Sequence, residues 1–359
     1  MAYRLILNPG STSTKLAVYR GREELFTQTL QHPQAEIEKY AGVVDQKDFR
    51  SRAVRGFLAE KNVNPGEIEG VIAIGGLIRP GDAGVYEVTP GMVADLTAAR
   101  YNEHASNLGA LIAADLAAEL GLKAYVADAV TTDEMQPAAR LSGLPEITRL
   151  GRSHALNQKS VAAMAAAELG LAYAEARLVV AHLGGGISIT AHRRGRMVDT
   201  NAARGEGPFC IDRTGGLNSY ELARLCFSGK YSQEEMLRKI AGNGGVVAYL
   251  GTRDFREVTQ RMRAGDVKAA GVFEAMAYQV AKEIAAMTVP LEGRVDALVL
   301  TGGMANSEEF TGAIAGQVGY LGRVLVFPGE REMEALAGYL DEVLAGRRAA
   351  LNYQAEGGA

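Results

Sequence analysis

The sequence predicts an α/β protein made of two copies of one fold, with mixed β-sheets covered by helices on both faces. Two observations lead to this prediction. A glycine-rich β-hairpin occurs near the N-terminus and again at the middle of the chain. An apolar run that ends in a glycine pair also occurs twice, at residues 70–77 and 296–304. Such continuous runs are typical of strands buried on both faces of a sheet.

The two hairpins are the runs LILNPGSTSTKLAVY (5–19) and VVAHLGGGISITAH (179–192). In each, apolar β-formers stop at a polar residue, glycine and hydroxyl residues fill the turn, and apolar alternation resumes. Glycine lets a ligand approach the backbone closely, so several N–H groups can converge on one phosphate. A purely structural turn is the alternative, because Gly and Ser fill tight turns without a ligand. The recurrence, with a third turn TGGMANS (301–307), favours nucleotide binding.

Each hairpin continues into a third expected strand, near residues 23–30 and 196–200, and a short apolar strand ends at Asp128. Helices are expected mostly where glycine follows the last apolar position. Their ranges are 93–100, 107–119, 160–169, 219–227, 233–240, 255–263, 267–287 and 332–347. The 359 residues suit two domains. We expect the first to hold 1–155 plus 330–359 and the second to hold 156–329.

Charge and cysteine content exclude several classes of partner. The 38 basic and 42 acidic residues give a net charge of −4, which argues against nucleic acid or an anionic membrane as the main partner. The sequence has no run of about 18 apolar residues and starts directly with a strand and turn, so we expect a soluble cytoplasmic protein. Cys210 and Cys226 are isolated, so neither a disulfide framework nor a zinc site is indicated.

The duplicated meander with glycine-rich tips resembles the actin-like ATPase superfamily, with its ribonuclease H-like fold, which includes acetate kinases, sugar kinases, Hsp70 and actin. The run NPGSTSTK resembles the first signature of acetate and butyrate kinases, with Asn8 where chaperones, actin and most sugar kinases have an acidic residue. The segments AHLGGGISI, SHALNQKSVA (153–162) and RDFREV (253–258) resemble that family's second phosphate loop, histidine segment and adenine pocket. PGEREMEALA (328–337) resembles the butyrate kinase version.

The resemblance implies a nucleotide in the interdomain cleft and reversible, in-line transfer of a phosphoryl group from ATP to butyrate or isobutyrate. It also implies ATP/ADP and Mg²⁺ as cofactors, and a homodimer or larger homo-oligomer. Acid–base chemistry also supports a carboxylate as the phosphoryl acceptor. A carboxylate with a pKa near about 4–5 is already an anionic nucleophile and needs no general base. It needs positive charge and aligned donors, because charge spreads over the phosphoryl oxygens in the transition state.

Arg213, in CIDRTGGL, is the expected transition-state arginine, because a planar fork of five donors suits phosphoryl oxygens or a carboxylate. An ordinary surface arginine is the alternative. His154 resembles the histidine that contacts the transferred phosphoryl group, and His104 resembles a second active-site histidine. A lone histidine is more often structural. Asp128 resembles a carboxylate close to the metal.

The sequence departs from the resemblance at one position. Butyrate kinases have an arginine directly before the first glycine pair, and here Ile74 stands there. Arg79 follows five residues later and is the expected substitute, which leaves substrate affinity open.

Glu332, Asp128 and Asn8 are the expected Mg²⁺ ligands, although Glu332 could instead satisfy a helix dipole. Lys15 is expected to face the phosphates, but it could instead be only the first charged residue of a strand. The run DFRE could begin a helix, with Phe255 in the core and Asp254 as its cap. His32 and His192 are read as surface residues. The residues expected to contact the nucleotide are Asn8, Ser11, Ser13, Lys15, His182, Gly184, Gly185, Gly186, Asp254, Phe255, Arg256, Gly302 and Gly303.

Three other functions stay open. Acetate or propionate kinase is the nearest, because one methylene is worth only about 1–3 kcal/mol of discrimination. A chaperone-like nucleotide-gated protein would need a peptide-binding extension after the two halves. A catalytically weak nucleotide-binding member is supported only by Ile74.

Overall fold

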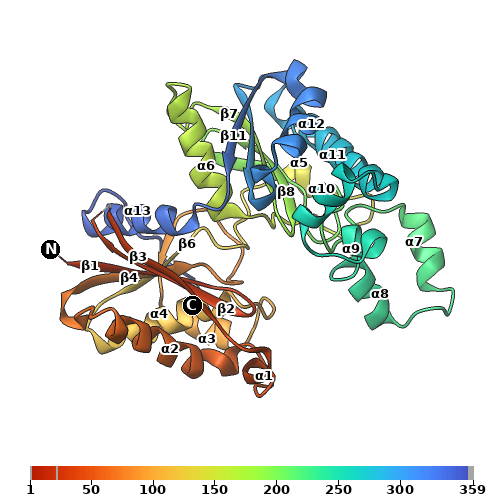
Figure 1. Cartoon of the computed structure of the whole chain (residues 1–359). Helices are drawn as coiled ribbons and strands as arrows, with labels where there is room; N and C mark the ends of the chain where they lie inside the picture. The colour runs from red at the N-terminus through yellow and green to blue at the C-terminus, as the bar shows by residue number, and fades with distance from the viewer. Residues whose placement is uncertain (1, 22, 355–359) are drawn as a thin grey trace. The chain divides into compact units, whose positions relative to one another are not determined.

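The computed structural model describes residues 2–21 and 23–354 (Figure 1). The chain divides into two compact units. Unit 1 contains residues 1–132 and 331–359, and unit 2 contains residues 133–330. The domain boundary expected between residues 155 and 156 stays a prediction. None of the helices in the described ranges combines the length and apolar character of a membrane span.

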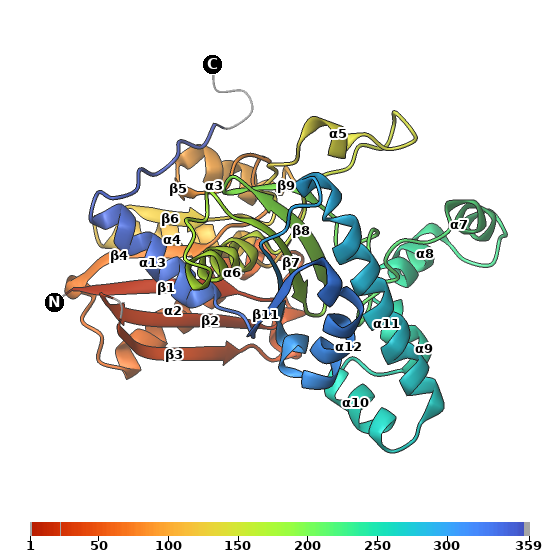
Figure 2. The ribbon, with the colours of Figure 1, turned by 90° about the horizontal axis from the view of Figure 1, so that it is seen from above.

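Unit 1 is built on a mixed sheet. Within the described residues its six strands lie in the order β3-β2-β1-β4-β6-β5. The strands β1, β4 and β6 are parallel, so their carboxyl ends lie at one edge of the sheet. Figure 2 shows the antiparallel strands β1, β2 and β3 side by side. The bounds are β1 (Tyr3–Pro9), β2 (Ser13–Arg20), β3 (Glu23–Gln31), β4 (Ile68–Ile74), β5 (Val85–Glu87) and β6 (Ala124–Ala127).

Helices cover both faces of this sheet (Figure 1). On one face, α4 packs its apolar side chains against Leu5 and Leu7 of β1. On the other face α13 packs against β4, where Gly70 leaves room for Leu340 and Leu344. The helices of unit 1 are α1 (Gln34–Ile37), α2 (Lys47–Glu60), α3 (Pro90–Thr97), α4 (Asn107–Glu119) and α13 (Glu332–Leu344), with short 3₁₀ turns η1 (Val44–Gln46) and η2 (Pro65–Glu67).

Unit 2 repeats the same design. Its five strands within the described residues lie in the order β11-β10-β7-β8-β9. The antiparallel meander β7-β8-β9 corresponds to β1-β2-β3, and β10 and β11 run parallel to β7. The predicted α/β class, the mixed sheets and both hairpins are therefore confirmed. The bounds are β7 (Arg177–Leu183), β8 (Ile187–Arg193), β9 (Arg196–Thr200), β10 (Ala297–Gly302) and β11 (Arg323–Pro328).

In unit 2, α6 packs on one face of the sheet against Leu178 and Val180, and α11 packs on the other face against Val179 and Ala181. Alternate residues of β7 thus point into two cores, as expected for a strand covered on both sides. The helices are α5 (Pro137–Arg140), α6 (Ala155–Glu168), α7 (Ser219–Cys226), α8 (Gln233–Ile240), α9 (Gly245–Leu250), α10 (Phe255–Arg263), α11 (Val267–Ala286) and α12 (Glu308–Val318), with 3₁₀ turns η3 (Val289–Leu291), η4 (Gly303–Asn306) and η5 (Gly319–Leu321).

Two histidine predictions are wrong. His32 and His192 were expected at the surface, but their exposed fractions are 5% and 0%. His32 Nε2 contacts Thr14 Oγ1 at 2.9 Å. His192 contacts the Tyr173 hydroxyl at 2.8 Å and Gln158 Oε1 at 3.2 Å. Polar groups of neighbouring residues contact one nitrogen of His32 and both nitrogens of His192, which lowers the cost of burying these imidazoles.

Candidate functional site

The carboxyl ends of β7 and β10 bring two glycine segments of unit 2 together. His182 of β7 lies opposite Thr301 of β10, and the turn at residues 184–186 follows it. Gly302 has φ +89°, and a Cβ at this position would lie 2.5 Å from the carbonyl oxygen of Leu183. The backbone of β10 therefore approaches β7 so closely that only glycine fits. The glycines expected to contact the nucleotide therefore lie together at the carboxyl ends of β7 and β10.

His154 and His182 also meet at this edge. Their rings stack with centroids 3.9 Å apart. His154 Nδ1 contacts Ser188 Oγ at 2.8 Å. His182 Nδ1 lies 2.8 Å from Asn157 Oδ1, and because an amide oxygen only accepts, Nδ1 carries the proton. Asn157 thus fixes the tautomer of His182, a role that the sequence analysis missed although Asn157 lies in the histidine segment.

Both stacked imidazoles are neutral at pH 7. Burial lowers the pKa of His154 to about 4, and the charge of Arg213 adds to this effect. Burial also lowers the pKa of His182 well below its usual value, with a smaller contribution from His154. The two rings can therefore serve as hydrogen-bond groups but not as cations. In this group the positive charge comes from Arg213.

Arg213 lies against the triple-glycine turn. A Cβ at Gly186 would lie 2.6 Å from Arg213 Nη1, so the guanidinium rests directly on the turn. Nη1 also donates to the carbonyl oxygen of Ala203 at 2.9 Å. The side chain is 32% exposed, so the guanidinium still faces solvent. The structure thus brings together four of the sequence-predicted site features, namely Arg213, His154, His182 and the glycines at 184–186.

The buried histidines predict acid sensitivity. Burial lowers the pKa from 6.5 to about 4 for His32 and His154 and to about 3 for His192, and lowers it strongly for His182. At pH 5 the unfolded chain has largely bound protons at these four sites, whereas the folded protein largely has not. The stability that the neutral rings contribute is therefore fully present above about pH 6.5 and is lost as the pH drops toward about 4, with a limiting slope of about 5 kcal/mol per pH unit.

Urea unfolding at pH 7, 6 and 5 checks this prediction through the midpoint. The His192→Gln variant should lose about a quarter of the slope. A wild-type midpoint that does not change between pH 7 and 5 would contradict the burial of these neutral rings.

The expected adenine segment lies at the start of α10. Asp254 caps this helix, since its Oδ1 accepts from the N–H of Arg256 at 2.9 Å. Phe255 is buried, and its ring lies 4.9 Å from that of Phe310 and 5.9 Å from that of Phe273. The structure therefore gives these residues the helix-cap and core roles that the sequence left as an alternative. Phe310 belongs to α12, which follows the turn at Gly302, so this contact links the segment to the glycine edge.

In unit 1, the carboxyl edge carries the expected oxygen ligands. Asn8 is the penultimate residue of β1, and its Nδ2 donates to Glu332 Oε2 at 2.5 Å. Asp128 follows β6, and its two oxygens accept from the N–H of Gly84 (2.8 Å) and the hydroxyl of Tyr339 (2.7 Å). Glu332 and Tyr339 both belong to α13, so this helix contacts the ends of two parallel strands. Glu332 has a specific partner beyond the helix dipole.

Amide and carboxylate oxygens are the ligands that Mg²⁺ prefers. No group of three or more His, Cys, Asp or Glu side chains suited to a metal is found in residues 2–21 and 23–354. A metal that takes one or two carboxylates and completes its shell with phosphate and water would not need such a group.

His104 and Arg79 lie on loops of unit 1. His104 Nδ1 contacts Ser106 Oγ at 2.8 Å, directly before α4. The first residue of α4, Asn107, accepts from the N–H of Leu77 at 2.8 Å, which ties this loop to the first glycine pair. Arg79 is exposed, and its Nη1 donates to the carbonyl oxygen of Gln354 at 3.3 Å. Arg79 thus contacts the C-terminal segment, and its substitution for the missing arginine stays a prediction.

The remaining phosphate candidates of unit 1 lie on the first hairpin. Lys15 is in β2 opposite Asn8, so it is both a strand residue and a neighbour of the turn. Ser11 is exposed in the turn, and Ser13 begins β2. Beneath them lies Arg50, a fully buried residue that the sequence analysis missed.

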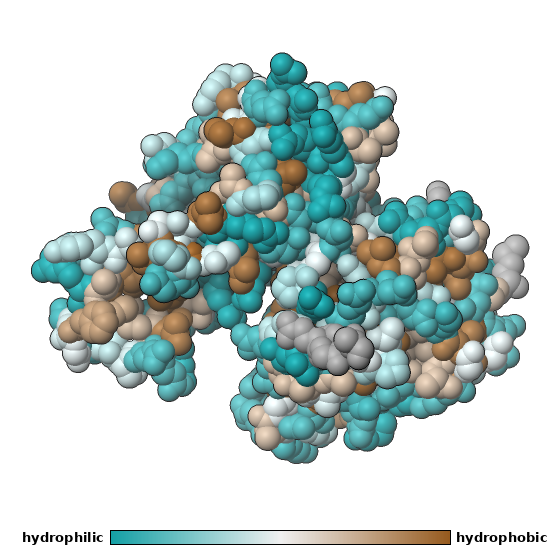
Figure 3. Space-filling view, turned by 180° about the vertical axis from the view of Figure 1, so that it is seen from behind, coloured by the Kyte–Doolittle hydropathy of each residue, from teal (hydrophilic) through white to brown (hydrophobic). Residues whose placement is uncertain are grey.

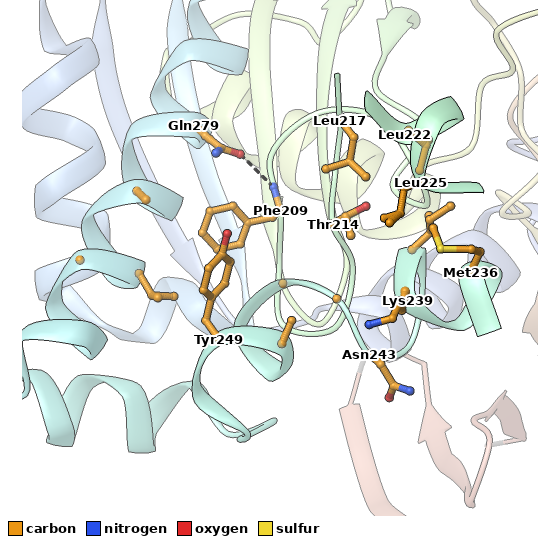
Figure 4. A pocket seen from close by; sticks show the side chains of 18 of the residues that line it. Phe209, Thr214, Leu217, Leu222, Leu225, Met236, Lys239, Asn243, Tyr249 and Gln279 are labelled. Atoms are coloured by element: carbon orange, nitrogen blue, oxygen red, sulfur yellow. Dashed lines mark hydrogen bonds between the residues drawn. The ribbon is translucent and has the colours of Figure 1, made fainter. Parts of the chain in front are cut away.

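A separate apolar pocket of about 710 Å³ lies among α7, α8, α9 and α11 (Figure 4). At one side Phe209 N–H donates to Gln279 Oε1 at 3.2 Å. Among the described residues that line this pocket, none is a predicted site residue.

The helix α7 leaves apolar side chains at the surface. None of its side chains is fully buried, and Phe227, which follows the helix, is 91% exposed. Figure 3 shows apolar side chains scattered among hydrophilic ones on the face seen from behind.

Comparison with known proteins adds the family. Residues 144–327 match the model of the acetokinase family. The chain is 46% identical over 343 residues to a probable butyrate kinase of Listeria innocua, covering 95% of this chain and 97% of that protein. It is 44% identical over 356 residues to butyrate kinase 2 of Clostridium acetobutylicum, covering 99% of this chain and 100% of that protein.

Solved structures support the fold. The acetate kinase of Porphyromonas gingivalis superposes with a TM-score of 0.77 at 20% identity, over 96% of this chain and 100% of that one. A propionate kinase of Francisella tularensis superposes with a TM-score of 0.75 at 20% identity, over 94% of this chain and 98% of that one.

Proposed function

This chain belongs to the acetokinase family, and we propose that it catalyses reversible phosphoryl transfer between ATP and butyrate or isobutyrate. The products are the acyl phosphate and ADP. The relatives that cover nearly the whole chain are named butyrate kinases, which supports this acceptor over acetate or propionate.

The arrangement at Gly186 carries the proposal. A cationic guanidinium lies on a glycine turn beside two imidazoles that are neutral at pH 7. Imidazoles with such low pKa values are weak bases, so this group suits an acceptor that arrives already ionised. A carboxylate is such an acceptor, whereas a hydroxyl would need a general base.

In this proposal the residues of unit 2 bind ATP. The N–H groups at residues 184–186 bind the β- and γ-phosphates, and Gly302 and Gly303 let the backbone approach the adenosine. Arg213 stabilises the charge that spreads over the transferred phosphoryl group, with His154 and His182 as neutral donors or acceptors. Asp254, Phe255 and Arg256 shape the purine site.

The residues of unit 1 bind the metal and the reacting groups. Asn8, Asp128 and Glu332 would hold Mg²⁺, which neutralises phosphate charge when bound. Ser11, Ser13 and Lys15 contact phosphate oxygens, and His104 and Arg79 contact the carboxylate. The Tyr339 hydroxyl and the Gly84 N–H orient Asp128, because each donates to one of its oxygens.

The test is trapping of acyl phosphate with hydroxylamine, using ATP·Mg²⁺ and a series of acetate, propionate, butyrate, isobutyrate and valerate. We expect the highest kcat/KM with butyrate or isobutyrate, and about a tenfold loss per missing methylene. A maximum at acetate or propionate would replace the acceptor by the shorter acid. No product with any acid, while ATP still binds, would leave a nucleotide-binding protein without kinase activity.

We also propose that the protein works as a homodimer or larger homo-oligomer in the cytoplasm. Tyr220 on α7 is 72% exposed and Phe227 just after it is 91% exposed, and large exposed apolar side chains are common at subunit interfaces. Light scattering on the purified protein distinguishes a monomer from an oligomer. The cytoplasm is proposed because the reaction uses ATP.

A further inference from the structure

Arg50 of α2 binds the backbone of the first hairpin's turn from the buried side of that turn. Its side chain has no exposed surface. Nη1 donates to the carbonyl oxygens of Gly10 (2.7 Å) and Ser13 (2.8 Å), and Nη2 donates to that of Ser11 (2.8 Å). Gln46 Oε1 accepts from Nε at 3.1 Å and from Nη2 at 2.7 Å, which orients the guanidinium. One buried fork therefore binds three carbonyl groups of a four-residue segment.

The charge of Arg50 has no carboxylate partner in the described part of the chain. Every acceptor named above is neutral. Burial is the only cause that changes the pKa of Arg50, and it lowers this pKa to about 10, so the guanidinium is charged at pH 7. The same charge helps to lower the pKa of His32. A buried, uncompensated cation destabilises a protein, so a counter-ion at the turn would relieve this cost.

The peptide geometry shows where such an anion can bind. The described chain has no cis peptide bond, and in a trans peptide the C=O and the following N–H point in opposite directions. Arg50 draws the carbonyl groups of Gly10 and Ser11 inward. The N–H groups of Ser11 and Thr12 therefore point away from it, toward the exposed side of the turn. Neither N–H has a hydrogen-bond acceptor within the described residues.

We propose that Arg50 is a positioning residue for phosphoryl binding, which fixes the turn at residues 10–13 with its N–H groups outward and takes the bound phosphoryl group as its counter-ion. This inference rests on the proposed function, and adds to it the residue that organises the first phosphate turn. Two contributions are distinguishable. The fork sets the direction of the N–H groups, and the charge adds attraction for the anion.

Calorimetric titration with ATP·Mg²⁺ measures both contributions without depending on catalysis. Arg50→Met removes fork and charge, and we expect Kd to rise by about 10-fold or more, with kcat/KM for ATP falling by about 10²-fold. Arg50→Lys keeps the charge and should recover part of the affinity. Gln46→Glu keeps the fork but supplies a carboxylate, so Kd should rise severalfold while the melting temperature stays equal or increases.

Arg4→Met is the matched control, because Arg4 is a nearly buried arginine of the same unit that pairs with Glu69 (3.0 Å) and Asp341 (2.7 Å). It should lower the melting temperature and leave Kd unchanged. A merely structural Arg50 would behave in the same way, which would overturn the inference. An unchanged Kd in Gln46→Glu would overturn the counter-ion role, even if Arg50→Met fails to fold.

The assays also separate this inference from the proposed function. A wild-type protein that forms no acyl phosphate refutes the kinase, while its ATP·Mg²⁺ affinity still decides the role of Arg50. A wild-type protein that does not bind ATP·Mg²⁺ refutes both.

Discussion

Arg213→Ala is expected to lower kcat for acyl phosphate formation by about 10³-fold, with the KM for ATP changed by less than about threefold. An arginine that contacts the transferred phosphoryl group acts mainly in the transition state, and losses of this size are typical for it. The folded protein should persist, because the side chain is 32% exposed and donates a hydrogen bond to one carbonyl group, that of Ala203.

Hydroxylamine trapping at saturating butyrate measures this effect. Arg213→Lys keeps the charge without the planar fork and should retain more activity than the alanine variant, though well below wild type. Arg224→Ala is the control, because Arg224 is an exposed arginine of the same unit that pairs with the exposed Glu221. An Arg213→Ala enzyme within threefold of wild type would remove Arg213 from the reaction.

Gly302→Ala is expected to lower the free energy of unfolding by roughly 3 kcal/mol or more. Gly302 has φ +89° and ψ 176°, a conformation open almost only to glycine, and strain there costs about 1–3 kcal/mol. The new Cβ would also lie 2.5 Å from the carbonyl oxygen of Leu183, so β7 and β10 would have to separate. Urea unfolding measures the change.

The neighbouring glycine gives a matched control. A Cβ at Gly303 would meet no atom within 4 Å, so Gly303→Ala should change stability by less than about 0.5 kcal/mol. Because that open space is where we propose the adenosine, the same variant should weaken ATP binding by about tenfold. Equal stability losses in the two variants would refute the close approach of the strands. Unchanged ATP affinity in Gly303→Ala would refute the adenosine site.

Local patterns were sufficient for much of the fold. The helices at residues 107–119, 233–240 and 255–263 were predicted with their observed bounds, because apolar periodicity and end signals agree there. The helix α2 was missed. Its buried positions include the polar residues Arg50 and Ser51, which obscure the apolar stripe. The strand β11 was also missed, because it is a short edge strand with exposed positions.

The candidate site likewise contains residues that the sequence predicts and residues that it does not indicate. The sequence predicts the glycine turns, His154, His182 and Arg213 as site residues, because each lies in a local motif whose residue types indicate phosphate chemistry. Arg50 was not found, since nothing in its own helix indicates that it contacts a turn 39 residues earlier. The burial of His192 was also missed, because its partners Tyr173 and Gln158 come from other elements.

The sequence by itself therefore determined the duplicated meander, the α/β class and the identity of the motif residues, because turns, periodicity and short motifs are encoded by near neighbours. Only the tertiary structure decided which polar groups meet. Three contacts join segments that are distant in sequence: the stacking of His154 on His182, the Asn8–Glu332 hydrogen bond, and the hydrogen bonds of Arg50 to the turn at residues 10–13. Hydrogen bonding and desolvation depend on distances in space, so pairing, charge state and site geometry follow only once the chain is folded.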